Sequence, residues 1–115
     1  MHSKHRLSNN KDFVTIYKKG KSFANRYFVL YIYKHAKSLD PFRLGVSVSK
    51  KVGNAVVRNR IKRLVKEVFL SKKDSLPTGY DFVIIARNAA STIDYQKTNE
   101  TIEILLKKSK IIRSM

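Results

Sequence analysis

The sequence predicts a single α/β (α+β) domain, a two-layer sandwich with the element order α-β-β-β-α-β-α. The chain has 115 residues and is 43% hydrophobic, which suits one domain with one core. Apolar side chains alternate with a period of two in residues 22–34 and 42–48, as in strands, and recur with helical spacing in three other segments. No repeat or linker divides the chain, so residues 1–115 form one domain, with 1–7 and 110–115 expected to fray.

A first helix is expected over about residues 10–19. Ser8 and Asn9 are both good N-caps, and Asp12 stands three residues after Asn9, close to a capping-box arrangement. Gly20 suits a left-handed position just beyond the end of this helix.

Aromatic side chains recur on this helix and on one side of the strand that follows. Phe13, Ile16 and Tyr17 share a helix face, and we assign Ile16 to the core. In residues 22–34 the aliphatic side should face the core, and the other side carries Tyr27, Val29, Tyr31 and Tyr33. Both sets of rings fit either a half-exposed packing surface or a platform for unpaired bases.

The segment from Arg43 to Lys66 contains eight basic side chains and no Asp or Glu. Its strand buries one face, and the opposite face is nearly bare, with room for a ligand: Arg43, Gly45, Ser47 and Ser49. Asn54 is the expected N-cap of the next helix, at about 55–70. Lys50 and Lys51 lie near its amino end, where free N–H groups, the helix dipole and two ammonium groups can meet one phosphate.

The outer face of this second helix is expected to bind a polyanion. An apolar stripe (Val57, Ile61, Leu64, Val65 and Val68) packs inward. The remaining face carries Arg58, Asn59, Arg60, Lys62, Arg63 and Lys66. A helix face that is merely solvated usually mixes its charges, and this face is almost entirely basic.

The last part of the chain completes the fold. Residues 81–87 form a continuous apolar run, typical of a strand covered on both faces. Ser91 and Asp94 resemble a capping box, and the helix that follows to about Lys108 should bury Ile102, Leu105 and Leu106.

Composition favours nucleic-acid binding, with an anionic membrane surface as the less favoured alternative. The formal charge is +17 and the pI is near 10.3, so a polyanionic partner offsets strong self-repulsion. The chain has no cysteine, which excludes disulfides, thiol catalysis and thiolate metal sites. Its apolar runs are too short to cross a bilayer, so we expect a cytoplasmic protein that does not bind membranes.

No catalytic constellation is visible in the protein itself. The eight acidic residues are scattered, and His2, His5 and His35 fall in segments expected to be flexible, without an acid–base partner. His2 and His5 have a spacing that can hold a metal, but we expect no metal or other cofactor bound by the protein alone.

Five stretches together resemble the protein subunit of bacterial ribonuclease P. The strongest is SVSKKVGNAVVRNRIKR at 47–63; the others are NNKDF at 9–13, SFANRYFVLY at 22–31, FRLGVSVSKK at 42–51 and VIIAR at 83–87. The resemblance implies a partner of a large catalytic RNA, with which the protein removes the 5′ leader from precursor tRNA. It implies that the RNA and its bound Mg²⁺ perform the hydrolysis. It also implies a left-handed βαβ crossover, which general rules of chain topology do not favour.

The same resemblance assigns roles to residues. Lys50, Lys51, Asn54 and the basic helix residues named above match the segment that meets the catalytic RNA. Phe13, Tyr17 and Tyr31 match aromatic positions of a cleft for the single-stranded leader, and we expect Arg43, Ser47 and Ser49 to line the same cleft. Tyr17 stands where Phe is expected, and Lys66 where some relatives have Arg. The alternatives are a ribosomal RNA-binding protein and, less favoured, a nuclease that acts without RNA.

Overall fold

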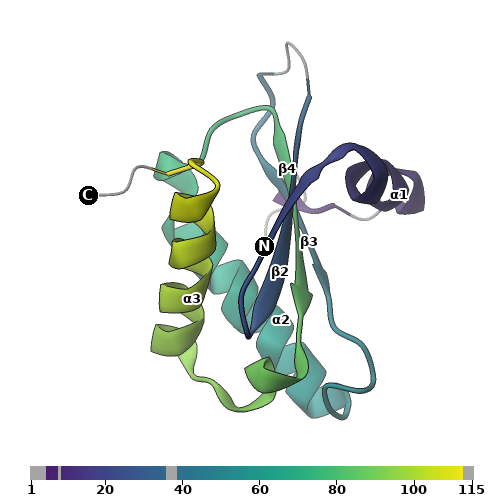
Figure 1. Cartoon of the computed structure of the whole chain (residues 1–115), viewed down its shortest axis with the longest axis vertical. Helices are drawn as coiled ribbons and strands as arrows, with labels where there is room; N and C mark the ends of the chain where they lie inside the picture. The colour runs from purple at the N-terminus through teal and green to yellow at the C-terminus, as the bar shows by residue number, and fades with distance from the viewer. Residues whose placement is uncertain (1–4, 8, 36–38, 113–115) are drawn as a thin grey trace.

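The computed structural model describes residues 5–7, 9–35 and 39–112 as three helices packed on one four-stranded sheet (Figure 1). The helices are α1 (Asn10–Lys19), α2 (Ala55–Ser71) and α3 (Tyr95–Lys108), and two short 3₁₀ turns, η2 (Lys73–Ser75) and η3 (Asn88–Thr92), connect later elements. The strands are β1 (Lys21–Ala24), β2 (Phe28–Lys34), β3 (Arg43–Ser47) and β4 (Tyr80–Ala86). The predicted α/β order is confirmed.

The sheet is mixed, with the strand order β1-β2-β4-β3. The alternating segment 22–34 forms a hairpin of β1 and β2, because the Asn25 side-chain oxygen accepts hydrogen bonds from the amides of Tyr27 and Phe28 at 3.0 and 2.9 Å. Strand β4 is antiparallel to β2 and parallel to β3. The chain therefore crosses from β3 through α2 to β4 as a βαβ unit, and the left hand of that crossover stays a prediction.

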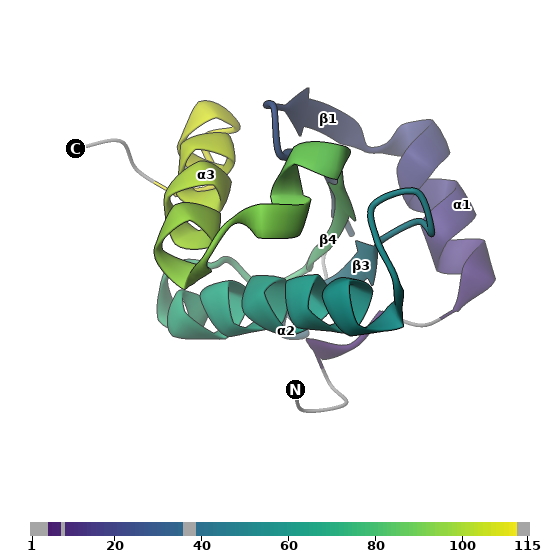
Figure 2. The ribbon, with the colours of Figure 1, turned by 90° about the horizontal axis from the view of Figure 1, so that it is seen from below.

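The two faces of the sheet bury different clusters. The larger core lies between the sheet and the pair α2 and α3, and includes Phe28, Leu30, Phe82 and Ile84. A smaller cluster on the opposite face joins Ile16 of α1 to Leu7 and Val83. Figure 2 shows this arrangement, with α1 on one side of the sheet and α2 and α3 on the other. The expectation that residues 81–87 are covered on both faces is confirmed for 81–84 and Ala86, whereas Ile85 is half-buried and Arg87 is exposed.

Two local predictions at helix ends were wrong. Gly20 is extended, with φ −74°, so its role is not a left-handed turn. A side chain there would place its Cβ 2.6 Å from the Ile16 carbonyl oxygen and 2.8 Å from that of Ile32, so close packing between α1 and β2 requires glycine. Asp94, not Ser91, caps α3 and accepts a hydrogen bond from the Lys97 amide, because η3 intervenes before the helix begins.

The segments expected to fray are partly tied into the fold. Leu7 is buried, and its amide donates a hydrogen bond of 3.0 Å to the Leu44 carbonyl. At the other end Lys110 takes a left-handed φ of 65°, its amide donates to the Lys107 carbonyl, and the Ile111 amide donates to the Leu106 carbonyl. This is the pattern of a Schellman cap, which satisfies the end of α3. Residues 1–4 and 113–115 lie outside the described residues.

Candidate nucleic-acid interface

Helix α2 presents a basic face because its apolar stripe is buried against the sheet. Asn54 starts the helix, and its side-chain oxygen accepts a 3.0 Å hydrogen bond from the Val57 amide. Ile61, Leu64, Val65 and Val68 are buried, as predicted. The basic face, as we name it, faces outward: Lys50, Lys51, Asn59 and Arg63 are exposed, and Arg58, Arg60, Lys62 and Lys66 are half-buried.

Two arginines of the basic face have distinct surroundings. The Arg60 guanidinium donates a 2.6 Å hydrogen bond to the carbonyl oxygen of Ile93, so it ties α2 to the chain that follows η3. Arg58 Nε is buried and has no hydrogen-bond partner within the described part of the chain. A buried donor left unpaired costs about 1–3 kcal/mol, which an incoming acceptor recovers.

Helix α1 crosses the opposite face of the sheet and places aromatic rings on it. The register sets Tyr31 beside Val83 and Val83 beside Gly45 in one row. A Cβ on Gly45 would lie 2.5 Å from Cζ of Phe13, so the Phe13 ring packs directly on that backbone. The bare strand face expected to admit a ligand is therefore filled at Gly45 by the protein's own ring.

The three predicted rings form one connected group. The Tyr17 and Tyr31 rings meet edge to face with their centroids 5.0 Å apart, and Phe13 lies 6.3 Å from Tyr17. Tyr17 remains 40% exposed. Burial, with a smaller contribution from Tyr31, raises the pKa of Tyr17 above its usual value, so its hydroxyl stays neutral at physiological pH.

The next row of this face is only partly covered. Val29, Ile85 and Ser47 are paired across β2, β4 and β3, and the first two are half-buried while Ser47 is exposed. The chain then continues from β3 through exposed Ser49 and Lys50 toward α2. In Figure 1, α1 lies beside the upper half of the sheet and this connection turns at the lower end. We call this row together with the rings of Phe13, Tyr17 and Tyr31 the aromatic cleft, after the role that the sequence predicts for these residues; that role stays a prediction.

A polar cluster anchors α1 above the cleft. Asp81 on β4 is 1% exposed, and its two carboxylate oxygens accept hydrogen bonds from Arg43 Nε and Nη2 at 2.8 and 2.7 Å. Arg43 Nη1 also donates to Asp12 of α1 at 3.2 Å. The hydrogen bond to Asp81 is the main reason that the pKa of Arg43 is raised. Arg43, expected to line a cleft, is thus engaged by two carboxylates of its own chain.

His35 joins this cluster and corrects an expectation. Its Nε2 lies 2.5 Å from an Asp81 oxygen and 3.4 Å from Arg43 Nη2, so it has an acidic partner. His5 is buried, with Nδ1 2.8 Å from the Phe42 carbonyl oxygen, and His2 lies outside the described residues. Among the residues described, no three His, Cys, Asp or Glu side chains are grouped to hold a metal ion.

The predicted residues thus fall on two surfaces. The basic face lies on α2, and the aromatic cleft lies on the sheet face that α1 partly covers. Sequence reasoning missed Val29 and Ile85 as the floor of the cleft; their alternation was visible, but their pairing with Ser47 depends on strand register. It also missed exposed Arg87, which follows β4 beyond Ile85 and donates to the Asn25 carbonyl at 3.2 Å.

No helix in the described ranges is long and apolar enough to span a membrane.

Comparison with known proteins gives one consistent result. The family model described as Ribonuclease P matches residues 1–110. The ribonuclease P protein component of Clostridium kluyveri is 49% identical over 107 residues, covering 91% of this chain and 94% of the relative. That of Bacillus cereus strain Q1 is 46% identical over 110 residues, covering 95% and 94%.

Solved structures agree in fold as well as in sequence. The RNase P protein of Staphylococcus aureus is 44% identical and superposes with a TM-score of 0.86, covering 95% of this chain and 98% of that one. The protein from Thermotoga maritima is 38% identical, with a TM-score of 0.79 and coverage of 90% and 96%.

Proposed function

The chain belongs to the ribonuclease P protein family, and on that premise we propose a separate binding role for each of its two surfaces. As a ribonuclease P protein subunit it is part of an endoribonuclease ribonucleoprotein and has an RNA partner. We propose that the basic face binds the catalytic RNA and that the aromatic cleft holds the single-stranded 5′ leader of precursor tRNA. The family assignment decides against a ribosomal protein.

One observation supports the leader cleft above all. The rings of Phe13, Tyr17 and Tyr31 adjoin a partly covered row of Val29, Ile85 and Ser47, and the chain continues from Ser47 to exposed Lys50 and Lys51. Ring faces accept any base, and each stacked base contributes about 1–3 kcal/mol, which suits a leader of variable sequence. The neutral Tyr17 hydroxyl adds no repulsion toward phosphates.

The basic face is suited to a folded RNA. Its cations neutralise phosphates and release counterions, so affinity should fall steeply as salt rises. Arginine binds phosphate oxygens in pairs of hydrogen bonds. A phosphate that draws the Arg58 side chain outward also relieves its buried, unpaired Nε.

We propose that the RNA, and not the protein, catalyses the hydrolysis. The carboxylates of Asp12 and Asp81 converge in the fold, but Arg43 lies between them and forms ion pairs with both. They are therefore unsuited to share a pair of catalytic metal ions. We propose that Mg²⁺ is bound through the RNA, and that the protein favours substrate and Mg²⁺ binding by screening phosphate repulsion.

The test compares precursor tRNA with mature tRNA as ligands of the reconstituted holoenzyme. Replacing Phe13, Tyr17 and Tyr31 with leucine keeps apolar bulk but removes the rings. Tyr95→Leu is the matched control, because Tyr95 is an exposed tyrosine at the start of α3. The triple variant should lose affinity for leader-bearing tRNA by roughly tenfold or more, since each stack contributes about 1–3 kcal/mol. Equal losses for both tRNAs would contradict the cleft assignment.

A further inference from the structure

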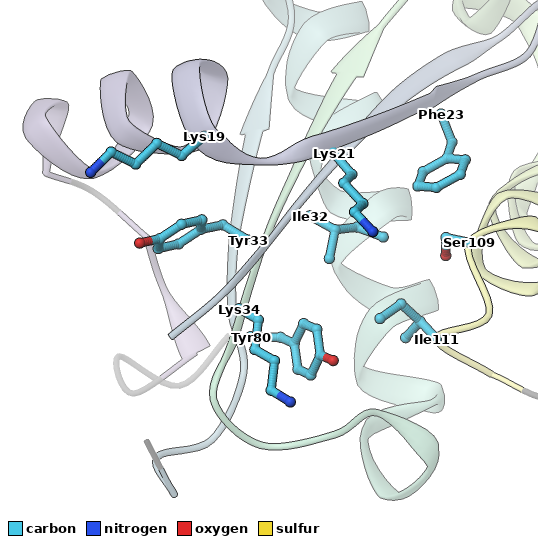
Figure 3. A pocket seen from close by; sticks show the side chains of 9 residues that line it. All are labelled: Lys19, Lys21, Phe23, Ile32, Tyr33, Lys34, Tyr80, Ser109 and Ile111. Carbon is cyan, nitrogen blue, oxygen red and sulfur yellow. The ribbon is translucent and has the colours of Figure 1, made fainter. Parts of the chain in front are cut away.

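A hollow lies at a corner of the sheet, where β1 begins and α3 ends. Its volume is about 330 Å³ (Figure 3). Lys21 pairs with Ile32, and Lys34 pairs with Tyr80, in the sheet register. Ile32 belongs to the larger core between the sheet and α2 and α3. Lys19 at the end of α1 and Tyr33, which packs against the smaller cluster on the α1 side, also line this corner pocket, as we name it. The pocket therefore takes in residues from both faces of the sheet, but Phe13, Tyr17 and Tyr31 do not line it.

The end of α3 shapes one wall of the corner pocket. The helix stops at Lys108, and the left-handed Lys110 turns the chain back so that the Ile111 amide donates to the Leu106 carbonyl. This reversal brings the Ile111 side chain to the pocket. In Figure 3, Ile111 lies across from the Tyr80 ring, and Phe23 stands at the far side.

The pocket combines flat apolar walls with cations at its margin. The Tyr80 ring is held parallel to Phe82, with centroids 6.1 Å apart and an interplanar angle of 10°. Lys34 Nζ lies 5.9 Å from the centre of the Tyr80 ring. Lys21 and Lys34 are exposed, and of the described residues that line the pocket none is acidic. Such a site favours a ligand that is planar, apolar on its faces and negatively charged at one end.

A single nucleotide has this chemistry and this size. Small-molecule sites are about 300–1,000 Å³, so a pocket of about 330 Å³ is at the small end of that range and excludes a folded RNA segment. Aromatic rings stack on bases, and lysines bind phosphates. The chain's charge of +17 and its RNA partner favour RNA over an acidic peptide.

We propose that the corner pocket binds one unpaired nucleotide of RNA, with the base against Tyr80 and Phe23 and the phosphate near Lys21 and Lys34. The proposal depends on the RNA-binding function above, and it adds a contact at residues that belong to neither the basic face nor the aromatic cleft. The nucleotide belongs either to the catalytic RNA or to the precursor tRNA.

The first experiment measures affinity of the full chain for ribonuclease P RNA across a range of salt. Lys21→Gln with Lys34→Gln removes two exposed pocket charges, and Lys73→Gln with Lys97→Gln removes two exposed charges elsewhere. The pocket variant should reduce the salt slope by about 0.7 for each phosphate that the protein no longer neutralises. The control should change the slope less.

The second experiment tests stacking and locates the nucleotide. Tyr80→Leu should weaken the complex roughly fivefold to a hundredfold, the range for one stacked base, with Tyr95→Leu as control. Chemical probing should find one nucleotide that becomes reactive in the Tyr80→Leu complex. Protection before precursor tRNA is added places it in the catalytic RNA, and protection only afterwards places it in the substrate.

The outcomes separate this proposal from the one on which it depends. If the pocket variants match their controls in affinity and salt slope, and no nucleotide changes reactivity, the corner pocket does not bind RNA. That result leaves leader cleavage by the holoenzyme unaffected. Because Lys21 and Lys34 are exposed, the lysine variant gives an answer even if Tyr80→Leu destabilises the fold.

Discussion

Replacing Gly45 with alanine should disturb the aromatic cleft from beneath. The added Cβ would lie 2.5 Å from Cζ and 2.7 Å from Cε1 of Phe13, more than 0.5 Å inside ordinary contact. The Phe13 ring must move, and α1 resists, because Asp12 beside it is bound to Arg43. Overpacking of this kind costs about 1–3 kcal/mol, or roughly 4 °C or more in melting temperature.

Urea unfolding and leader-dependent tRNA affinity measure the two consequences of Gly45→Ala. Both should fall, whereas Ser47→Ala, on the same face of β3 but exposed, should change stability by no more than about 0.5 kcal/mol. Adding Phe13→Leu should restore part of the stability of Gly45→Ala but not its leader affinity. Wild-type stability and affinity in Gly45→Ala would refute the packing of Phe13 on β3 and its role in the cleft.

Three further changes test the parts that support this surface. Asp81→Asn should lower the free energy of unfolding by about 3 kcal/mol, because it leaves Arg43 without its buried partner. The control Glu103→Gln, in a weak surface pair, should lower it by less than about 0.5 kcal/mol. Equal losses in the two variants would contradict the stabilising role of the Arg43–Asp81 pair. Because the pKa of Tyr17 is raised in the folded state, its contribution to the free energy of unfolding is fully present below pH 10. That contribution is lost as the pH rises through the folded-state pKa. Wild-type stability should therefore fall relative to Tyr17→Phe only above about pH 10, and parallel pH profiles would count against the shift. Lys110→Gly should stabilise the chain by about 1 kcal/mol in urea, because glycine adopts φ 65° without strain; no gain would mean that the turn is not strained.

Local patterns made much of the fold predictable. The helices at 10–19 and 55–71 and the strand faces follow from periodicity, which reports burial directly. The cap of α3 was misplaced because Ser91 and Asp94 satisfy the same sequence pattern, and only the 3₁₀ turn between them decides which residue starts the helix.

The polar cluster and the floor of the cleft could not be predicted in the same way. Arg43 and Asp81 are 38 residues apart and meet because β3 and β4 pair in parallel in one particular register. The sequence pattern predicts Asp81 as the polar start of an apolar strand and His35 as a loop residue. Their contact depends on strand pairing across the sheet, which alternation within a strand does not encode.

We propose above that this protein enables an RNA to cut precursor tRNA. The most direct measurement is 5′-leader cleavage by ribonuclease P RNA at low Mg²⁺, with and without the protein, beside the protein alone. We expect cleavage only in the mixture, with a loss of stimulation when the rings of the aromatic cleft are removed. Metal-dependent cleavage by the protein alone, or no stimulation of an RNA that it binds, would contradict the account.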